Sequence, residues 1–328
     1  MSPHNILVLG VGGNVSIGIV KAIKSSNIDA YVVGACIQKY AAGFAFCDKN
    51  LLSPHANSPE FLSWLQRTLE DNNIHVVLSG VEEINNILSN HVNLRKETKI
   101  LAPLKNQLEI FNDKLATVNW LAKNNIEHPK TLDLREKYSF SQIEKVVGLP
   151  FIVKPRIGKG SAGVVIIESE QQYQELKNKN ECISQQLIGD ANTEYTCGVY
   201  KSKYGYMEII IMRRFLRNGS TIIAEVEKNK IIYNYCKEIA DSLDASTPFN
   251  IQLRLCKDSY KPYSFEINMR LSGTTAIRHG FGFKDCQVWI KESLFKKSFQ
   301  CDFNVKPGVA LRYEAEVFLS KTDLLNEN

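Results

Sequence analysis

Apolar residues near the N-terminus come in short runs that are separated by amphipathic segments. Three of these runs have the length of strands, and they cover residues 5–9, 30–35 and 75–79. Residues 17–24 and 58–72 carry apolar positions at helical spacing, and a Ser-Pro pair opens the second segment, as is typical of a helix N-terminus. Strands that alternate with helices favour a parallel sheet covered by helices, so we predict an α/β domain.

The pattern changes beyond about residue 105. Asn112 or Asp113 is suited to cap a helix that runs to about residue 123. From residue 150 to about residue 271 the chain shows short strands, hairpins and interspersed helices, which indicate an α+β architecture. The sequence therefore predicts an α/β domain followed by an α+β domain.

The stretch FEINMRLSG, residues 265–273, alternates like a half-buried strand. Its odd-numbered positions are apolar, whereas Glu266, Asn268 and Arg270 occupy the even-numbered ones. Because successive side chains of a strand point to opposite faces, the odd positions from Phe265 onward should join a core. The other face should then carry an acid, an amide and a guanidinium.

A second strand, residues 251–255, is only a short polar turn away, so the two segments predict an antiparallel hairpin. Opposed residues share a face, which places Gln252 opposite or diagonal to Glu266 and Asn268. Oxygen donors of this kind suit Mg²⁺ or Mn²⁺ that also takes phosphate oxygens, and Arg270 on the same face is placed to meet phosphate. The alternative is a solvated sheet face on which Glu266 pairs with Arg270.

Two glycine-rich segments are candidates for anion binding. The first, residues 10–18 (GVGGNVSIG), follows the first strand, but Val15 stands where a dinucleotide-binding GxGxxG turn needs its third glycine. The segment favours a turn that binds another small anion, or a structural turn, over a binding site for a nicotinamide cofactor. The second, residues 154–166, places three glycines and three cations between two apolar runs. It predicts two strands joined by a mobile loop around a polyphosphate, or else a solvated basic hairpin.

Residues 183–196 predict a strand, a short linker and another strand. The backbone of such a linker can offer amide and carbonyl groups to a purine, and Glu194 could accept hydrogen bonds from ribose hydroxyls. A plain connection between two strands is the alternative.

Composition narrows the class of protein. The 328 residues are 44% hydrophobic and 23% charged, as in an ordinary globular chain, and they are enough for two domains or one large multi-lobed domain. The 40 basic and 35 acidic residues are interspersed, which gives no indication of nucleic acid or membrane as a partner, although a net charge of +5 suits an anionic ligand. Eight cysteines without a CxxC pair argue against a zinc site or a disulfide framework, so we predict reduced thiols and a cytoplasmic protein.

Taken in order, these segments resemble the ATP-grasp superfamily, and more narrowly its carbamoyl-phosphate-synthase-like carboxylate-amine ligases. The resemblance covers essentially the whole chain. It implies a pre-ATP-grasp α/β domain with a parallel sheet over residues 1–105, linker helices and a small lobe with a glycine-rich lid over 106–180, and a large lobe with the metal and phosphate site over 181–328. The segments that carry it are NDK (112–114), FIVKP (151–155), QQLIG (185–189), EYT (194–196), NIQ (250–252) and FEINMRLSG (265–273).

The resemblance also implies roles for individual residues. ATP would lie between the two lobes, with Mg²⁺ or Mn²⁺ held by Gln252, Glu266 and Asn268. Lys154 and Arg270 would be the catalytic groups. Two residues depart from the family's pattern, since Gln185 stands where many relatives carry glutamate and Met269 where proline is usual. The implied nucleotide-binding residues are Lys114, Lys154, Gly158, Lys159, Gly160, Ser161, Gln185, Gln186, Leu187 and Glu194.

The implied reaction joins a small-molecule carboxylate to an amine through an acyl phosphate, with release of ADP and phosphate. Homodimers are common among the relatives. The alternatives are a kinase-like or nucleotide-sensing protein and a nicotinamide-dependent oxidoreductase. His279 is expected to be structural or a neutral hydrogen-bonding group, with substrate contact or acid-base chemistry as the alternative. Arg312 could serve the site or an oligomer contact. Weaker substrate candidates are Arg213, Arg214, Ser272, Gly273, Thr274 and Arg278, together with residues 12–14, Glu82 and Glu83.

Overall fold

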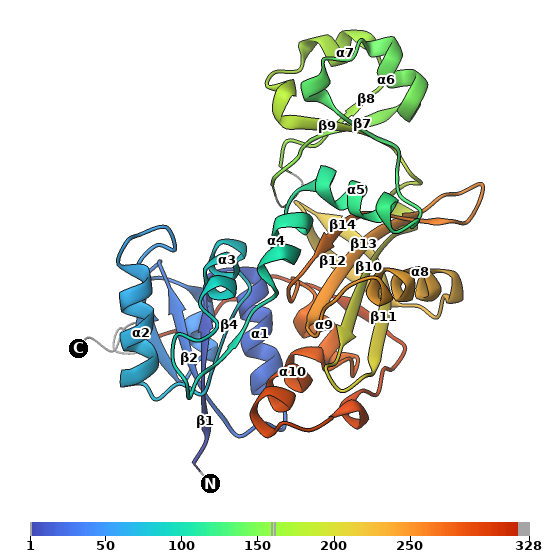
Figure 1. Ribbon diagram of the computed structural model, residues 1–328. Helices are drawn as coiled ribbons and strands as arrows, with labels where there is room; N and C mark the ends of the chain where they lie inside the picture. Colours follow the sequence, from blue (N-terminus) through green and yellow to red (C-terminus); the bar gives the residue numbers. More distant parts are fainter. Residues whose placement is uncertain (1, 159, 161, 321–328) are drawn as a thin grey trace.

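The computed structural model describes residues 2–158, 160 and 162–320. Figure 1 shows three parts: an N-terminal domain and a large lobe that lie side by side, and a small lobe that stands above the large lobe. Lys159 and Ser161, both predicted to bind nucleotide, lie outside the described residues.

The N-terminal domain is a parallel five-stranded sheet in the order β3-β2-β1-β4-β5. Apolar clusters fill both faces of the sheet, which explains why its strands read as continuous apolar runs. The predicted α/β domain is therefore confirmed. Its elements are β1 (His4–Leu9), α1 (Asn14–Lys24), β2 (Ala30–Cys36), β3 (Lys49–Leu52), α2 (Phe61–Asp71), β4 (Val76–Ser79), α3 (Glu82–Asn90) and β5 (Lys99–Leu101).

The strand order reverses between β1 and β4, because β2 lies on one side of β1 and β5 lies beyond β4. In open parallel sheets, the loops that leave the carboxyl ends of strands at such a switch point form a ligand-binding crevice. Here the two loops lead to Asn14 at the start of α1 and to Glu82 at the start of α3. The fold thus directs both helix starts toward one crevice.

The small lobe is a four-stranded sheet in the order β6-β9-β7-β8. β7 and β8 pair antiparallel on either side of the glycine-rich segment, as predicted. Because β9 pairs with β6 and β7, the small lobe extends to Gln186 and not only to residue 180. Its elements are β6 (Thr131–Asp133), α6 (Phe140–Val147), β7 (Phe151–Pro155), β8 (Val165–Ile167), α7 (Glu170–Glu175) and β9 (Cys182–Gln186).

Two linker helices, α4 (Lys105–Phe111) and α5 (Lys114–Lys123), pack on the large lobe. Asp113 caps α5, since its carboxylate accepts a hydrogen bond from the amide of Leu115 at 2.8 Å. Phe111 and Leu121 belong to the large-lobe core. The linker is therefore part of the large lobe in its packing.

The large lobe is a six-stranded antiparallel sheet in the order β14-β13-β10-β11-β12-β15. α8 covers one face, and α9 and α10 pack against α1 of the N-terminal domain. α1 and α9 come into contact at Gly18, where a Cβ would lie at an ordinary contact distance, 3.6 Å, from the amide nitrogen of Ala276 on α9. The elements are β10 (Glu194–Lys201), β11 (Met207–Arg217), β12 (Ser220–Val226), α8 (Lys230–Asp241), β13 (Pro248–Leu255), β14 (Pro262–Asn268), α9 (Thr275–Gly280), α10 (Asp285–Phe295) and β15 (Val309–Leu311).

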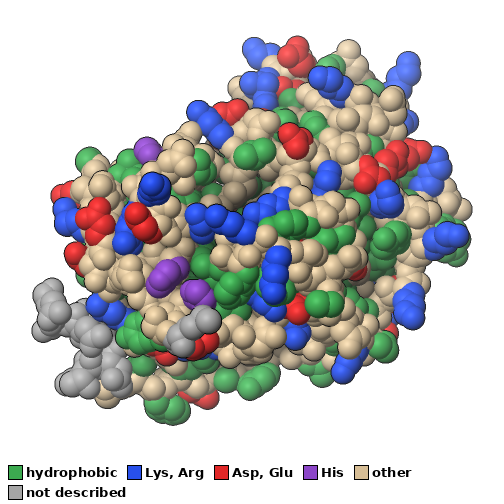
Figure 2. All heavy atoms as spheres, turned by 60° about the horizontal axis from the view of Figure 1, so that its bottom comes forward, with side chains coloured by type: hydrophobic (Ala, Val, Ile, Leu, Met, Phe, Trp, Pro, Cys, Tyr) green, Lys and Arg blue, Asp and Glu red, His purple; other side chains and the backbone are tan. Residues whose placement is uncertain are grey.

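The molecular surface carries charges of both signs. Figure 2 shows basic and acidic side chains interspersed over one face of the molecule. Among the described residues, the helices are all too short or too polar to cross a bilayer.

A buried ion pair joins α9 to the start of α10. Arg278 and Asp285 are both fully buried, and Nη2 of Arg278 lies 2.5 Å from Oδ2 of Asp285. Burial raises the pKa of Asp285. Nη1 of Arg278 donates to Oγ of Ser272 at 3.2 Å. Arg278, predicted as a substrate candidate, thus acts on the site by holding the polar loop that begins at Ser272.

Replacing Asp285 by asparagine should destabilise the protein strongly, because it leaves the Arg278 guanidinium buried without a counter-charge. We expect D285N to lower the free energy of unfolding by about 3–5 kcal/mol, measured by urea denaturation. The exposed pair of Lys237 and Asp241 provides the control, since D241N should cost less than about 1 kcal/mol. Equal unfolding midpoints for the two variants would contradict this role of the pair.

Candidate active site

The polar face of the β13–β14 hairpin forms the floor of the candidate site. Gln252 lies directly opposite Glu266, and Asn250 lies opposite Asn268. Ile267 on the other face is fully buried in the large-lobe core. The predicted pairing is therefore confirmed, and the hairpin gathers amide and carboxylate oxygens on one side of the sheet.

A β-bulge in this hairpin corrects one prediction. The pairing shifts between Gln252 and Leu253, so Phe265 has no partner of its own on β13. Instead of joining the core with the other odd-numbered residues, Phe265 lines the cleft, and Nζ of Lys154 lies 5.5 Å from the centre of its ring. The strict alternation of the sequence could not reveal this change of face.

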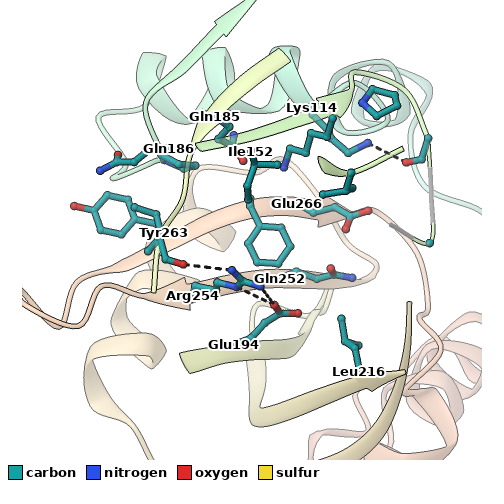
Figure 3. A pocket seen from close by; sticks show the side chains of 18 of the residues that line it. Lys114, Ile152, Gln185, Gln186, Glu194, Leu216, Gln252, Arg254, Tyr263 and Glu266 are labelled. Atoms are coloured by element: carbon teal, nitrogen blue, oxygen red, sulfur yellow. Dashed lines mark hydrogen bonds and ion pairs between the residues drawn. The ribbon is translucent and has the colours of Figure 1, made fainter. Parts of the chain in front are cut away.

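The cleft lies between the small-lobe sheet and the polar face of the large-lobe sheet (Figure 3). Ile152 of the small lobe and Leu216 of the large lobe face it from opposite walls. Such a space, with apolar residues on both walls and many polar and charged groups, suits a planar aromatic ligand with a charged tail. The polar residues that line it are Lys114, Lys154, Gln185, Gln186, Glu194, Arg214, Gln252, Arg254, Tyr263 and Glu266.

Glu194 lies at the bottom of the cleft and is only 5% exposed. Its carboxylate pairs with Arg214 at 2.8 Å and with Arg254 at 2.7 Å. Arg214 also donates to Oε1 of Gln252 at 2.8 Å, which ties Glu194 to the metal candidate. Two guanidiniums compensate the buried charge and fix the position of the carboxylate, which retains lone pairs for a ligand hydroxyl.

Two lysines face the cleft above the hairpin. Burial, against the opposing effect of Glu266 and with smaller contributions from Lys114 and Arg254, lowers the pKa of Lys154 to about 7. Nζ of Lys114 donates to the carbonyl oxygen of Gly158 at 3.0 Å, which links it to the glycine-rich loop, and burial lowers its pKa. Both ammonium groups are placed to meet an anion in the cleft.

The glycine-rich loop needs its glycines for conformational reasons. Gly160 and Gly163 have φ of 67° and 71°, in the left-handed region that side chains with a Cβ avoid. The loop reaches the turn between β11 and β12, where a Cβ on Gly219 would lie 2.6 Å from the carbonyl oxygen of Gly160. The loop therefore spans from the small lobe to the large lobe across one end of the cleft.

The segment that connects the two lobes lines the cleft with a different set of residues from the predicted one. Gln185 is almost fully buried, and its Nε2 donates to Oγ1 of Thr131 at 2.9 Å. Gln185 and Gln186 both line the cleft, but the next lining residue is Ile188, whereas Leu187 is not among the lining residues. We therefore place Ile188, in addition to the two glutamines, along the predicted nucleotide.

The donor set on the hairpin suits a divalent cation that arrives with phosphate. Glu266 provides a carboxylate, and Gln252 and Asn268 provide amide oxygens. Within the described ranges no group of three or more His, Cys, Asp or Glu side chains could form a complete protein cage for a metal. Mg²⁺ commonly takes one or two protein carboxylates and completes its shell with phosphates and water, so these residues fit a metal that the nucleotide carries.

Arg270 connects the hairpin to the N-terminal domain. Its Nη2 lies 2.6 Å from Oε1 of Glu82, the first residue of α3. Arg270 lines a second pocket, which adjoins the cleft because Glu266 and Gln252 line both. An incoming phosphate would compete with Glu82 for this guanidinium.

The second pocket brings together several of the substrate candidates. Ser272, Gly273, Thr274 and Asn14 all line it, and Arg214 lines both pockets. Arg213, also predicted as a substrate candidate, does not face this pocket. It lies on the opposite face of β11, where its Nη2 is 2.5 Å from Oε2 of Glu225. Neighbouring residues of a strand face opposite sides of the sheet, so of these two arginines only Arg214 faces the cleft.

Arg254 and Asn250 received no role in the sequence analysis, and Arg312 was left open there between the site and an oligomer contact. Arg254 and Asn250 lie two positions on either side of Gln252, so the strand alternation that identified Gln252 could also have identified them. Arg312 lines the second pocket because β15 joins the edge of the large-lobe sheet. That pairing is distant in the chain, and no local signal predicts it.

The two lobes, the glycine-rich loop between them and the polar hairpin define a nucleotide-binding fold of the ATP-grasp class. A family model described as an ATP-grasp domain matches residues 111–274, which is half of the chain. The chain belongs to the ATP-grasp family. This confirms the resemblance, and it makes ATP with Mg²⁺ the expected ligand of the cleft.

Relatives and solved structures agree with this family. The chain is 22% identical over 315 residues to the carbamoyl phosphate synthase large chain of Saccharolobus solfataricus. This match covers 84% of this chain but only 29% of that relative. An N5-carboxyaminoimidazole synthetase from Staphylococcus aureus complexed with ADP has a TM-score of 0.71 at 15% identity, over 94% of this chain and 80% of that one. An L-amino acid ligase from Bacillus licheniformis has the same TM-score at 14% identity, over 94% and 78%.

The lowered pKa of Lys154 makes nucleotide binding depend on pH. At pH 8 the free protein holds Lys154 mostly neutral, whereas bound phosphate favours the ammonium form, so binding should take up close to one proton. Affinity for ATP should therefore fall as pH rises above about 7, by up to about tenfold per pH unit. Calorimetry in buffers of different ionisation enthalpy measures this uptake directly.

The control is K154R, which keeps a cation that does not titrate in this range. It should bind ATP with no proton uptake from this position. Equal uptake by the wild type and K154R at pH 8 would show that Lys154 is not the titrating group.

Proposed function

We propose that the protein is an ATP-dependent ligase that joins a carboxylate to an amine through an acyl phosphate. The observation that carries this proposal is the position of Glu266 and Gln252, which face each other at the boundary of two adjoining pockets. One pocket has the apolar walls and lysines that suit a nucleotide, and the other is lined by polar groups that suit a small substrate. A phosphoryl group at the boundary would lie between the two.

The groups at this boundary suit phosphoryl transfer, which depends mainly on positioning and charge neutralisation. Mg²⁺ bound with the nucleotide would supply further neutralisation of the phosphates. Lys154 is placed to hold a phosphate oxygen on the nucleotide side, and Arg270 is placed to hold the transferred group on the substrate side. A substrate carboxylate would attack the γ-phosphorus of ATP with release of ADP, and an amine would then displace phosphate from the acyl phosphate.

The reactive intermediate has to be kept from water, and the glycine-rich loop supports this step. An acyl phosphate hydrolyses readily, so its site must be covered during the reaction. The loop already reaches the turn that contains Gly219, and Gly160 lines both pockets. We infer that the loop opens to admit ATP and closes over the intermediate.

The cysteines of the protein favour a cytoplasmic setting for this reaction. The eight cysteines all fall among the described residues, and each is a free thiol. Free thiols persist in a reducing compartment, where ATP is also abundant. The substrates would be small molecules.

The class of reaction can be tested with purified protein, ATP, Mg²⁺ and a panel of carboxylates and amines. We expect release of ADP and phosphate that requires one acid and one amine together, with an amide product detected by mass spectrometry. ADP release with a phosphorylated product and no need for an amine would instead indicate a kinase-like enzyme. ATP binding without any turnover over the panel would favour a nucleotide sensor.

E266Q should abolish this turnover, because it removes the one carboxylate of the predicted metal set with almost no change in shape. We expect a loss of at least about 100-fold in kcat, as is typical when a principal electrostatic group is removed. The matched control is E70Q on the exposed surface of α2, which should leave turnover unchanged. Unfolding midpoints should be similar for both variants, and undiminished turnover by a folded E266Q would contradict the metal assignment.

A further inference from the structure

The second pocket has the features of a binding site for an oxygen anion. It lies beyond Glu266 as seen from the nucleotide cleft, and it is bounded by the loop from Ser272 to Thr274, by Arg312 and by the start of α1. Among the residues that the structure describes, its lining includes three arginines but only one acid, Glu266. Arg214 and Arg270 already pair with carboxylates of other elements. Arg312 is the cation that distinguishes this pocket.

Arg312 has hydrogen-bonding capacity left for a ligand. Its Nη2 donates to the carbonyl oxygen of Gly273 at 2.7 Å, which fixes the guanidinium at the wall of the pocket. No carboxylate elsewhere in residues 2–158, 160 and 162–320 forms a salt bridge with it. A guanidinium presents donors in a planar fork that matches a carboxylate or a phosphate.

The start of α1 adds a second attraction for an anion. Asn14 and Val15 of its first turn line the pocket, and this end of α1 points to the switch point of the parallel sheet. The N-cap residue Gly13 offers no side chain to cap the helix, and the first turn contains no acidic residue. The partial positive charge of the helix start is therefore left for an external ligand.

Asn250 provides an independent sign that a ligand with acceptor atoms belongs here. It is fully buried and lines the pocket. Its Oδ1 accepts hydrogen bonds from Thr196 at 3.1 Å and from Arg278 at 3.4 Å, so the orientation of the amide is fixed by two donors. Its Nδ2 donor has no partner among the described residues. Buried donors are rarely left unpaired in native proteins, and an oxygen anion would satisfy this one.

We propose that this pocket, formed by Arg312, the start of α1 and Asn250, binds a carboxylate or phosphate group of the substrate other than the carboxylate that is activated. The inference rests on the proposed ligase function and narrows its substrates to small molecules with a second oxygen anion. The group would be held on the far side of Glu266 from ATP. Its capture would orient the reacting carboxylate toward the γ-phosphate.

The test is a calorimetric titration of the full chain saturated with Mg²⁺ and a non-hydrolysable ATP analogue, which occupies the phosphate positions of the cleft. Inorganic phosphate and acetate are the two probes, at constant ionic strength. We expect saturable binding of at least one probe, and the tighter one identifies the type of anion. R312Q should weaken this binding by about tenfold or more, whereas R312K should retain part of it.

N14D provides a second variant that does not threaten the fold. An acidic side chain at the start of a helix favours the helix but repels an anion, so the thermal midpoint should be unchanged or higher while binding of the probe weakens. R217Q, which changes an exposed arginine outside both pockets, is the matched control and should bind as the wild type does.

Equal affinity of the wild type and R312Q for both probes would overturn the proposal, as would the absence of saturable binding to the wild type. Failure of the ATP analogue to bind would instead count against the ligase function. The titration would then be repeated without nucleotide, and the same comparison of R312Q with the wild type would still decide whether the anion site exists.

Discussion

The register of the β13–β14 hairpin is the constraint on which the site depends. Gln252 opposes Glu266 because the two strands pair antiparallel, and a slip of one residue would turn these side chains into the large-lobe core. Burial of Ile267 on the other face makes such a slip costly. The apolar core of the lobe therefore fixes the polar set, and the neighbouring strands β10 and β11 add Glu194 and Arg214 to the same face.

The N-terminal domain completes the site through its strand order. The switch point between β1 and β4 directs the starts of α1 and α3 toward the hairpin, where Glu82 meets Arg270. Close packing of α1 against α9 joins the two parts. Substrate recognition can thus be divided between the domains, with the phosphoryl-transfer groups on the large lobe and the anion-attracting helix start on the N-terminal domain.

Local patterns in the sequence predicted much of this structure, and long-range pairing accounts for most of the rest. Alternation along residues 265–271 predicted the face that carries Glu266 and Asn268, and Arg270, just beyond the end of β14, lines the same pocket. The bulge that moves Phe265 into the cleft leaves no such periodic signal. Arg213 and Arg214 were indistinguishable as neighbours until the register of β11 separated them. Arg312 depends on β15 pairing with a strand more than eighty residues away in the chain, which no local pattern encodes.

The central claim is that the hairpin holds metal-bound ATP at the boundary of the two pockets. A crystal structure with a non-hydrolysable ATP analogue and Mn²⁺, whose anomalous scattering locates the metal, tests it most directly. The account predicts an anomalous peak that is coordinated by Glu266 and by the triphosphate, with the purine against Ile152 and Ile188. A metal bound away from Glu266, or a triphosphate outside the cleft, would contradict it.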